Sequence, residues 1–147
     1  MKHLSQFIWQ EIEPIAKSIL ELAVERAPWE SGLLRSSGKC QLNGKTFATT
    51  TADNQGNFTV NTVSVKPGPG DIELVYSFYR PGHSVELSIY LHENLDYRPR
   101  KSGPMGAKYL ESSIKEHSRD LARAVREAIN SWWKHQNPEL NIEFIII

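Results

Sequence analysis

The sequence is poor in cysteine, balanced in charge and free of long apolar runs. Cys40 is the only cysteine among 147 residues, so no internal disulfide can form, which is typical of a reducing compartment. Lys and Arg number 17, as do Asp and Glu, so the formal net charge is zero. A protein that mainly binds nucleic acid normally carries a basic excess. No segment approaches the roughly 20 apolar residues of a membrane span, and residues 1–4 do not begin a signal peptide. We expect a soluble, unexported protein with no membrane partner.

Motifs for catalysis, metals and cofactors are missing as well. His92-Glu93 could bind a metal or transfer protons, but it lacks the second histidine of a His-Glu-x-x-His motif. Cys40 lies in a loop-like sequence without an activating motif. The glycine-rich segments around Pro69 and Pro104 contain prolines, which remove amide donors that a phosphate-binding loop requires. We therefore expect that the protein is not an enzyme and that it binds no cofactor or metal. An enzyme with a His92-Glu93 site ranks third among our hypotheses for its function.

Two segments have the periodicity of amphipathic helices. Between residues 4 and 26, apolar residues recur every three or four positions, and Ala27-Pro28 is expected to end this helix. Pro14 lies inside it and either kinks the helix or starts a second one. A second stripe predicts one long helix over residues 107–134. The members of this stripe are Leu110, Ile114, Leu121, Val125, Ala128 and Trp132.

The region between these helices has the pattern of an antiparallel sheet. Residues 46–51 and 58–66 are rich in Thr and Val and flank a turn. Residues 72–79 and 85–91 alternate around a four-residue Pro-Gly turn, which predicts a β-hairpin with one buried and one solvated face. The segments 28–45 and 94–106 are expected to be irregular, the second as a basic loop.

This order of elements predicts a single α+β domain over residues 1–137. Its antiparallel sheet, containing the β-hairpin, packs against the N-terminal helix and a long C-terminal helix. Residues 138–147 form a C-terminal apolar extension whose Phe144 is a candidate subunit contact, because an apolar strand can pair with a neighbour's sheet edge. Trp133 is a second candidate subunit contact. Adjacent residues of a helix cannot both face one core, so Trp133 is expected to be partly exposed if Trp132 is buried. Exposed aromatic residues are enriched at interfaces.

Positive charge is concentrated between residues 98 and 108. Arg98, Arg100 and Lys101 are candidates for contacts with protein partners. The alternative is a small nucleic-acid-binding module that uses the basic loop 98–108 on phosphates, with an affinity that falls steeply as salt rises.

Three segments resemble proteins of long-tailed phages. Residues 27–37 (Ala-Pro-Trp-Glu-Ser-Gly-Leu-Leu-Arg-Ser-Ser) resemble the Ala-Pro-x-x-Thr/Ser-Gly-x-Leu-Arg-x-Ser segment that follows the first helix in a family of tail components. Residues 89–97 resemble the Tyr-x-x-x-Val-His-Glu-Asn strand end of phage minor capsid proteins, and residues 106–111 resemble their Gly-x-x-Lys-Phe-Leu-Glu helix start. The order matches over roughly residues 4–130 and departs at 38–70 and after Pro138.

The resemblance implies a non-enzymatic virion protein that joins head and tail or completes the tail. Such a subunit forms a ring, commonly of six copies, between the head connector and the tail-tube or tail-terminator proteins, with DNA at most passing through the channel. It implies no cofactor, and a location in the virion or, during assembly from a phage or prophage, in the host bacterial cytoplasm.

The first of these segments supplies further candidate contacts, namely Ser31, Gly32, Leu34 and Arg35. Gly32 can adopt positive φ and reverse the chain. Leu33 or Leu34 can anchor the segment to the core. Arg35 can bind a carboxylate of its own chain or of a neighbour in a forked geometry.

Overall fold

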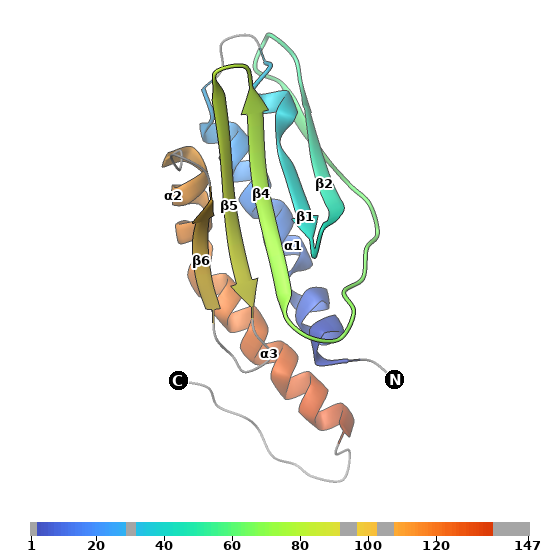
Figure 1. Ribbon diagram of the computed structural model, residues 1–147. Helices are drawn as coiled ribbons and strands as arrows, with labels where there is room; N and C mark the ends of the chain where they lie inside the picture. The colour runs from blue at the N-terminus through green and yellow to red at the C-terminus, as the bar shows by residue number, and fades with distance from the viewer. Residues whose placement is uncertain (1–2, 29–31, 92–96, 103–107, 137–147) are drawn as a thin grey trace.

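The protein has the expected α+β fold. The computed structural model describes residues 3–28, 32–91, 97–102 and 108–136. Within them, six antiparallel strands form one sheet in the order β3-β2-β1-β4-β5-β6, and the helices lie on one face of it (Figure 1). The helices are α1 (Leu4–Arg26), the short 3-10 helix η1 (Arg35–Ser37), α2 (Lys108–Glu116) and α3 (Ser118–Gln136). The strands are β1 (Lys39–Leu42), β2 (Lys45–Ala52), β3 (Phe58–Thr62), β4 (Ile72–Arg80), β5 (His83–Leu91) and β6 (Tyr97–Ser102).

Helix α1 packs on the sheet and also against α2 and α3, which lie beside it on the same face of the sheet (Figure 1). Its fully buried positions include Ala16 and Ala23, whose small side chains allow neighbouring elements to approach. Ala16 accepts a hydrogen bond of 2.8 Å from the Tyr76 hydroxyl of β4, which ties the helix to the centre of the sheet. Pro14 lies inside the continuous helix, on its exposed side, so the backbone carbonyl that loses its partner can bind water.

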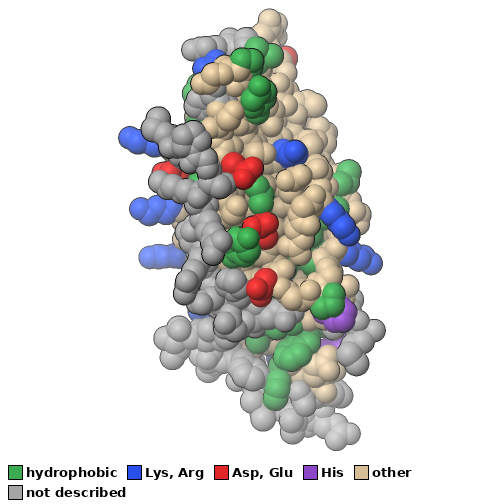
Figure 2. Space-filling view, in the orientation of Figure 1, with side chains coloured by type: hydrophobic (Ala, Val, Ile, Leu, Met, Phe, Trp, Pro, Cys, Tyr) green, Lys and Arg blue, Asp and Glu red, His purple; other side chains and the backbone are tan. Residues whose placement is uncertain are grey.

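The sheet buries one face and leaves the other open to solvent, as the alternation predicts. In β4, Ile72, Leu74, Tyr76 and Phe78 are buried, while the residues between them are half-buried or exposed. No described helix lies on the other face. This uncovered face carries a cross-strand row of mostly polar residues, Asn61, Thr49, Lys39, Ser77 and Glu86. Figure 2 looks onto it and shows mainly uncharged polar side chains and backbone, with Lys and Arg projecting mostly at the margins.

Several strand predictions need correction. Residues 39–42, expected to be irregular, form β1 in the middle of the sheet, where four residues are too few to give a clear periodic signal. The predicted basic loop contains the edge strand β6 instead, because its backbone pairs with β5. Strand β3 ends at Thr62 rather than Lys66. The hairpin turn contains two residues, Pro81 and Gly82, and Gly82 has a φ of 82°.

The C-terminal helix is divided into two rather than continuous. Helix α2 ends at Glu116 and α3 begins at Ser118. At the break, the His117 amide donates to the Ile114 carbonyl (3.2 Å), three residues back, and its ring Nδ1 lies 2.8 Å from the Ser113 carbonyl. This tighter turn redirects the chain. As a result Trp132 and Trp133 are both half-buried, whereas the single stripe predicts that Trp132 is buried.

Candidate functional site

Residues 32–38, which follow α1, form a tight loop against the turn between β2 and β3. We call residues 32–38 the Arg35 loop. Gly32 has a φ of 81°, as its predicted chain reversal requires. A Cβ atom at Gly32 would lie 2.4 Å from the Asp53 carbonyl oxygen, a distance that non-bonded atoms do not tolerate. Glycine is therefore required here both for its conformation and for the contact between two backbones.

Arg35 holds this loop in place through three carbonyl groups. Its Nε donates to Ala27 (3.1 Å), one terminal nitrogen donates to Glu25 (2.9 Å) and the other to Gly56 (3.4 Å). The first two carbonyls belong to the end of α1 and the third to the β2–β3 turn, so one guanidinium joins three segments. The expected carboxylate partner is not found in the described part of this chain, because exposed helix-end carbonyls accept the donors instead. A subunit contact at Arg35 stays a prediction.

Thr50 of β2 fixes the other end of the Arg35 loop. Its hydroxyl donates to the Arg35 carbonyl (2.5 Å) and accepts a hydrogen bond from the Gly38 amide (2.8 Å). Thr50 is 5% exposed, so these polar groups are satisfied inside the protein. The Ser37 hydroxyl accepts from the Tyr79 amide (2.8 Å) and so attaches the loop to β4 as well. The loop is therefore a rigid platform at one end of the sheet.

The turn that supports the loop is organised by Asp53. Its carboxylate accepts hydrogen bonds from the Gln55 amide (2.8 Å), the Asn57 amide (3.0 Å) and the Asn57 side chain (3.0 Å). These donors stabilise the charged form, and the side chain of Asn57 contributes most to lowering the pKa of the Asp53 carboxyl below its usual value.

The structure places the remaining predicted contact residues in three different regions. Leu34, within the Arg35 loop, is buried in the hydrophobic core, which confirms that a leucine of this segment anchors it. Arg98, Arg100 and Lys101 belong to β6, the strand at one edge of the sheet. Trp133 is half-buried on α3. Ser31 and Phe144 lie outside the described residues, as do His92 and Glu93.

These residues do not meet in one site. Phe7, near the start of α1, contacts His135 at the end of α3 in a tilted arrangement, with ring centroids 5.7 Å apart. Arg35 instead binds carbonyls at the other end of α1. A helix of 23 residues is about 34 Å long, so Trp133 and Arg35 are close to opposite ends of the molecule. The predicted contact residues therefore lie in separate regions and do not form one binding pocket, and their roles in subunit contacts stay predictions.

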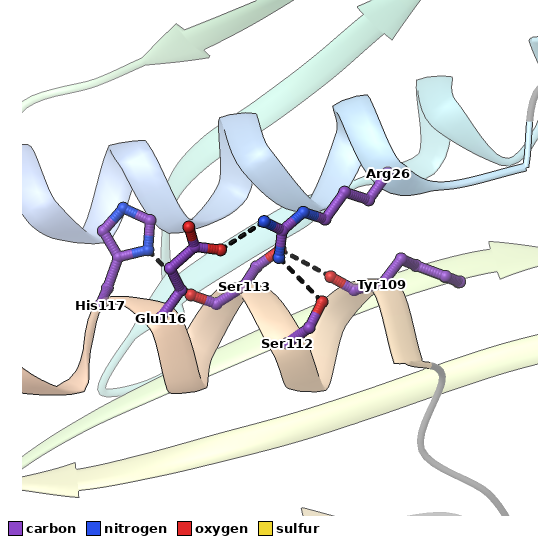
Figure 3. A network of polar contacts seen from close by, with 6 residues as sticks. All are labelled: Arg26, Tyr109, Ser112, Ser113, Glu116 and His117. Atoms are coloured by element: carbon purple, nitrogen blue, oxygen red, sulfur yellow. Dashed lines mark hydrogen bonds and ion pairs between the residues drawn. The ribbon is translucent and has the colours of Figure 1, made fainter.

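An acidic groove between α1 and the α2–α3 junction was not predicted from the sequence. It has a volume of about 560 Å³ and is lined by Ser18, Glu21, Leu22, Glu25, Glu116, His117 and Asp120. At its end the Arg26 guanidinium pairs with Glu116 and donates to the Ser112 hydroxyl at 3.0 Å (Figure 3). The carboxylates of α1 and those of the α2–α3 region come from parts of the chain more than about 90 residues apart in sequence. No local sequence motif therefore predicts the groove.

Cys40 is not placed for nucleophilic chemistry. It is fully buried in β1, and this burial raises the pKa of its thiol to about 12, although a hydrogen bond with Tyr76 acts in the opposite direction. The thiolate, the reactive form, is therefore strongly disfavoured. Among the described residues, no group of three or more His, Cys, Asp or Glu side chains is arranged to hold a metal ion. None of the described helices is long and apolar enough to cross a bilayer.

Comparisons of the chain with protein-family models, with curated proteins and with solved structures gave no match.

Proposed function

We propose that this protein is a structural subunit of the neck or tail end of a long-tailed phage, where copies form a ring that joins head and tail or completes the tail. The observation that carries the proposal is the Arg35 loop. The segment that resembles the phage tail components is a fixed platform, held by Arg35, Thr50 and Gly32 to α1, to β2 and to the β2–β3 turn. A segment held in this way can present a constant surface to a partner.

The exposed apolar residues near this platform also support the proposal. Leu33, within the loop, is 60% exposed, and Tyr79, whose amide binds Ser37 of the loop, is 63% exposed. Large exposed apolar side chains that adjoin a rigid backbone are suited to contacts with another protein. The partner could be a second copy, the head connector or a tail protein.

The experiment is to disrupt the gene in its parent phage or prophage and to examine the lysate by electron microscopy. Filled heads with separate tails are expected for a joining role, whereas abnormally long tails would assign the protein to tail termination. Normal infectious virions would overturn the proposal. Complementation with the double variant Leu33→Ser/Tyr79→Ser is expected to restore few particles. The matched control Leu33→Met/Tyr79→Phe keeps the apolar area and is expected to restore wild-type yield.

A nucleic-acid-binding module is the second candidate, and one observation favours it. Arg98, Arg100 and Lys101 belong to β6, and this strand lies at an edge of the sheet. Three charges give only a modest affinity for phosphates. Retardation of duplex or single-stranded DNA at low salt, lost at higher salt and absent in an Arg98→Gln/Arg100→Gln/Lys101→Gln variant, would support this candidate. No retardation at low salt would remove it.

A further inference from the structure

Three exposed arginines form a row on the outer face of α3. Arg119, Arg123 and Arg126 are spaced by four and three residues, which places them on one side of the helix. All three side chains are exposed, whereas the buried residues of α3, among them Leu121 and Ala128, occupy the opposite side. The three residues, which we call the arginine row, extend over about 10 Å along the helix axis. They therefore point away from the core.

The arginine row differs from the other arginines whose side chains the structure describes. Arg26 pairs with Glu116, and Arg35 donates to three backbone carbonyls. Arg80 interacts electrostatically with Tyr109. No hydrogen bond or ion pair links the arginine row to another group in the described part of the chain. Its guanidinium groups are therefore available to a ligand.

The arginine row is unfavourable for the helix that carries it. Like charges three or four residues apart on a helix repel each other. Arg119 also lies in the first turn of α3, where the helix dipole favours anions over cations. Asp120 and Glu127 are seven residues apart, on the side of α3 that faces the acidic groove, and neither pairs with the row. Folding does not explain this arrangement, whereas a bound anion would offset the repulsion.

The surroundings of the row indicate which anion fits it. The planar guanidinium group binds phosphate oxygens in a forked geometry. Residues 118–131 of α3 contain no aromatic side chain on which the bases of a single strand could stack. The apolar side of α3 packs on α1, so it is not available to enter a bilayer. Duplex DNA carries one negative charge per about 1.7 Å of its axis, so a row of this length meets phosphates in any register.

We propose that the arginine row of α3 binds the phosphate backbone of duplex DNA. Contacts with phosphates carry no sequence information, so the binding is independent of sequence. The formal net charge of the chain is zero, and salt screens charges beyond about 10 Å at 0.1 M. The affinity therefore depends on direct contacts by these three side chains. The inference goes beyond the proposed phage function, does not require a ring, and uses a surface other than β6.

The experiment measures binding of the purified chain to a fluorescein-labelled duplex by fluorescence anisotropy at salt concentrations from about 20 to 200 mM. The test variant is Arg119→Gln/Arg123→Gln/Arg126→Gln, and the corresponding triple lysine variant keeps the charge of the row. The matched control removes three cations from β1, β2 and the β3–β4 connection instead. It is Lys39→Gln/Lys45→Gln/Lys66→Gln. Circular dichroism checks that each variant folds.

For three phosphate contacts, we expect the affinity of the wild-type chain to fall about 500-fold over this tenfold rise in salt. The glutamine variant should bind at least about tenfold more weakly at low salt and lose most of the salt dependence. The lysine variant and the matched control should keep the salt dependence of the wild-type chain. Thermal unfolding of the glutamine variant should occur at the same temperature or higher, because the row has no partner within the described part of the chain.

Three outcomes would overturn the proposal. The first is a wild-type chain that does not bind the duplex at low salt. The second is equal weakening by the glutamine variant and by the matched control, which would report total charge rather than the row. The third is tighter binding to polyglutamate, to phosphatidylserine vesicles or to single-stranded DNA, which would assign the row to another anion. If the triple variant fails to fold, Arg123→Gln alone replaces it and should lower the slope of the salt dependence by about one third.

The outcome in solution is separable from the other two proposals. Binding that is lost in the triple β6 variant but kept in the glutamine variant of the row would overturn the α3 site and support the second candidate function. No DNA binding together with separated heads and tails after gene disruption would overturn the α3 site alone. DNA binding through the row together with normal virions would overturn the phage function alone.

Discussion

The backbone of Gly32 passes so close to Asp53 that no side chain can be accommodated between them. A Cβ atom at Gly32 would lie 2.4 Å from the Asp53 carbonyl oxygen and 2.9 Å from its carbonyl carbon. This contact joins the loop after α1 to the β2–β3 turn. The position of the Arg35 loop thus depends on having glycine at position 32 as well as on the hydrogen bonds of the loop.

Gly32→Ala is expected to destabilise the protein by at least about 2 kcal/mol, since it adds a steric clash to the strain of a positive φ. Gly44 is a matched control. Its φ of 83° is almost the same, but a Cβ there would meet no atom within 4 Å, so Gly44→Ala should cost only the conformational strain, about 1 kcal/mol. Urea denaturation of both variants measures the difference. Equal losses would mean that the contact with Asp53 has no energetic weight.

Arg35→Lys is expected to behave almost like Arg35→Ala. An ammonium group cannot reach the carbonyls of Glu25, Ala27 and Gly56 together, whereas the planar guanidinium does. We expect both variants to lose about 1–2 kcal/mol of stability and to show faster hydrogen exchange in the β2–β3 turn. Arg26→Ala is the comparison, because its ion pair with Glu116 is largely exposed and should contribute less than about 1 kcal/mol. Rescue by lysine would contradict the carbonyl-binding role.

Thr50→Val should cost about 1–3 kcal/mol, because it leaves the Gly38 amide and the Arg35 carbonyl without their buried partner. Valine has nearly the same shape as threonine, so the loss reports the hydroxyl group. Thr50→Ser keeps the hydroxyl and should retain more of the stability than Thr50→Val. Thermal unfolding followed by circular dichroism compares them. A serine variant that is less stable than the valine variant would assign the effect to packing of the methyl group.

Alkaline pH should weaken the fold. Burial raises the pKa of Cys40 from 9.0 to about 12 and that of Tyr109 from 10.0 to about 12. Both groups keep their protons in the folded chain at pH values where the unfolded chain has lost them. Their contribution to stability is therefore complete below about pH 9 and declines as pH rises toward 12. Urea denaturation between pH 8 and about pH 11 measures the decline, and Cys40→Ala should make it shallower.

The same shift predicts slow alkylation of Cys40. At neutral pH the thiolate is therefore much rarer in the folded chain than in the unfolded chain. Mass spectrometry after iodoacetamide treatment, with and without denaturant, measures the two rates. Rapid labelling of the folded protein would show that Cys40 becomes accessible.

The sequence predicts the long elements better than the short ones. Strands β4 and β5 and helix α1 have enough residues for their periodicity to be distinctive, and they were predicted nearly to their ends. Strand β1 has four residues, and β6 carries Pro99 and three cations, so neither has a local strand signal. Both depend on pairing with strands whose register is set elsewhere. The break at His117 likewise depends on packing, since the apolar spacing alone continues across it.

For the candidate site, the sequence indicates the important segment but not its contacts. Gly32 has the expected positive φ and Leu34 the expected burial, because backbone conformation and apolar burial are local preferences. The subunit contacts expected of these two residues stay predictions. The partners of Arg35 could not be predicted, since carbonyl groups occur at every residue and only the fold selects three of them. Thr50 gave no signal, since it is one of several threonines in β2.

The position of α1 has a consequence for the synthesis of the chain. Its apolar side packs against α2 and α3 as well as against the sheet, and Arg26 pairs with Glu116, 90 residues further on. At a translation rate of about 5–20 residues per second, α1 waits for several seconds before its last partner leaves the ribosome. The side of α1 that packs against α2 and α3 therefore stays uncovered throughout that interval, whereas the strands that pack against its other side are made earlier.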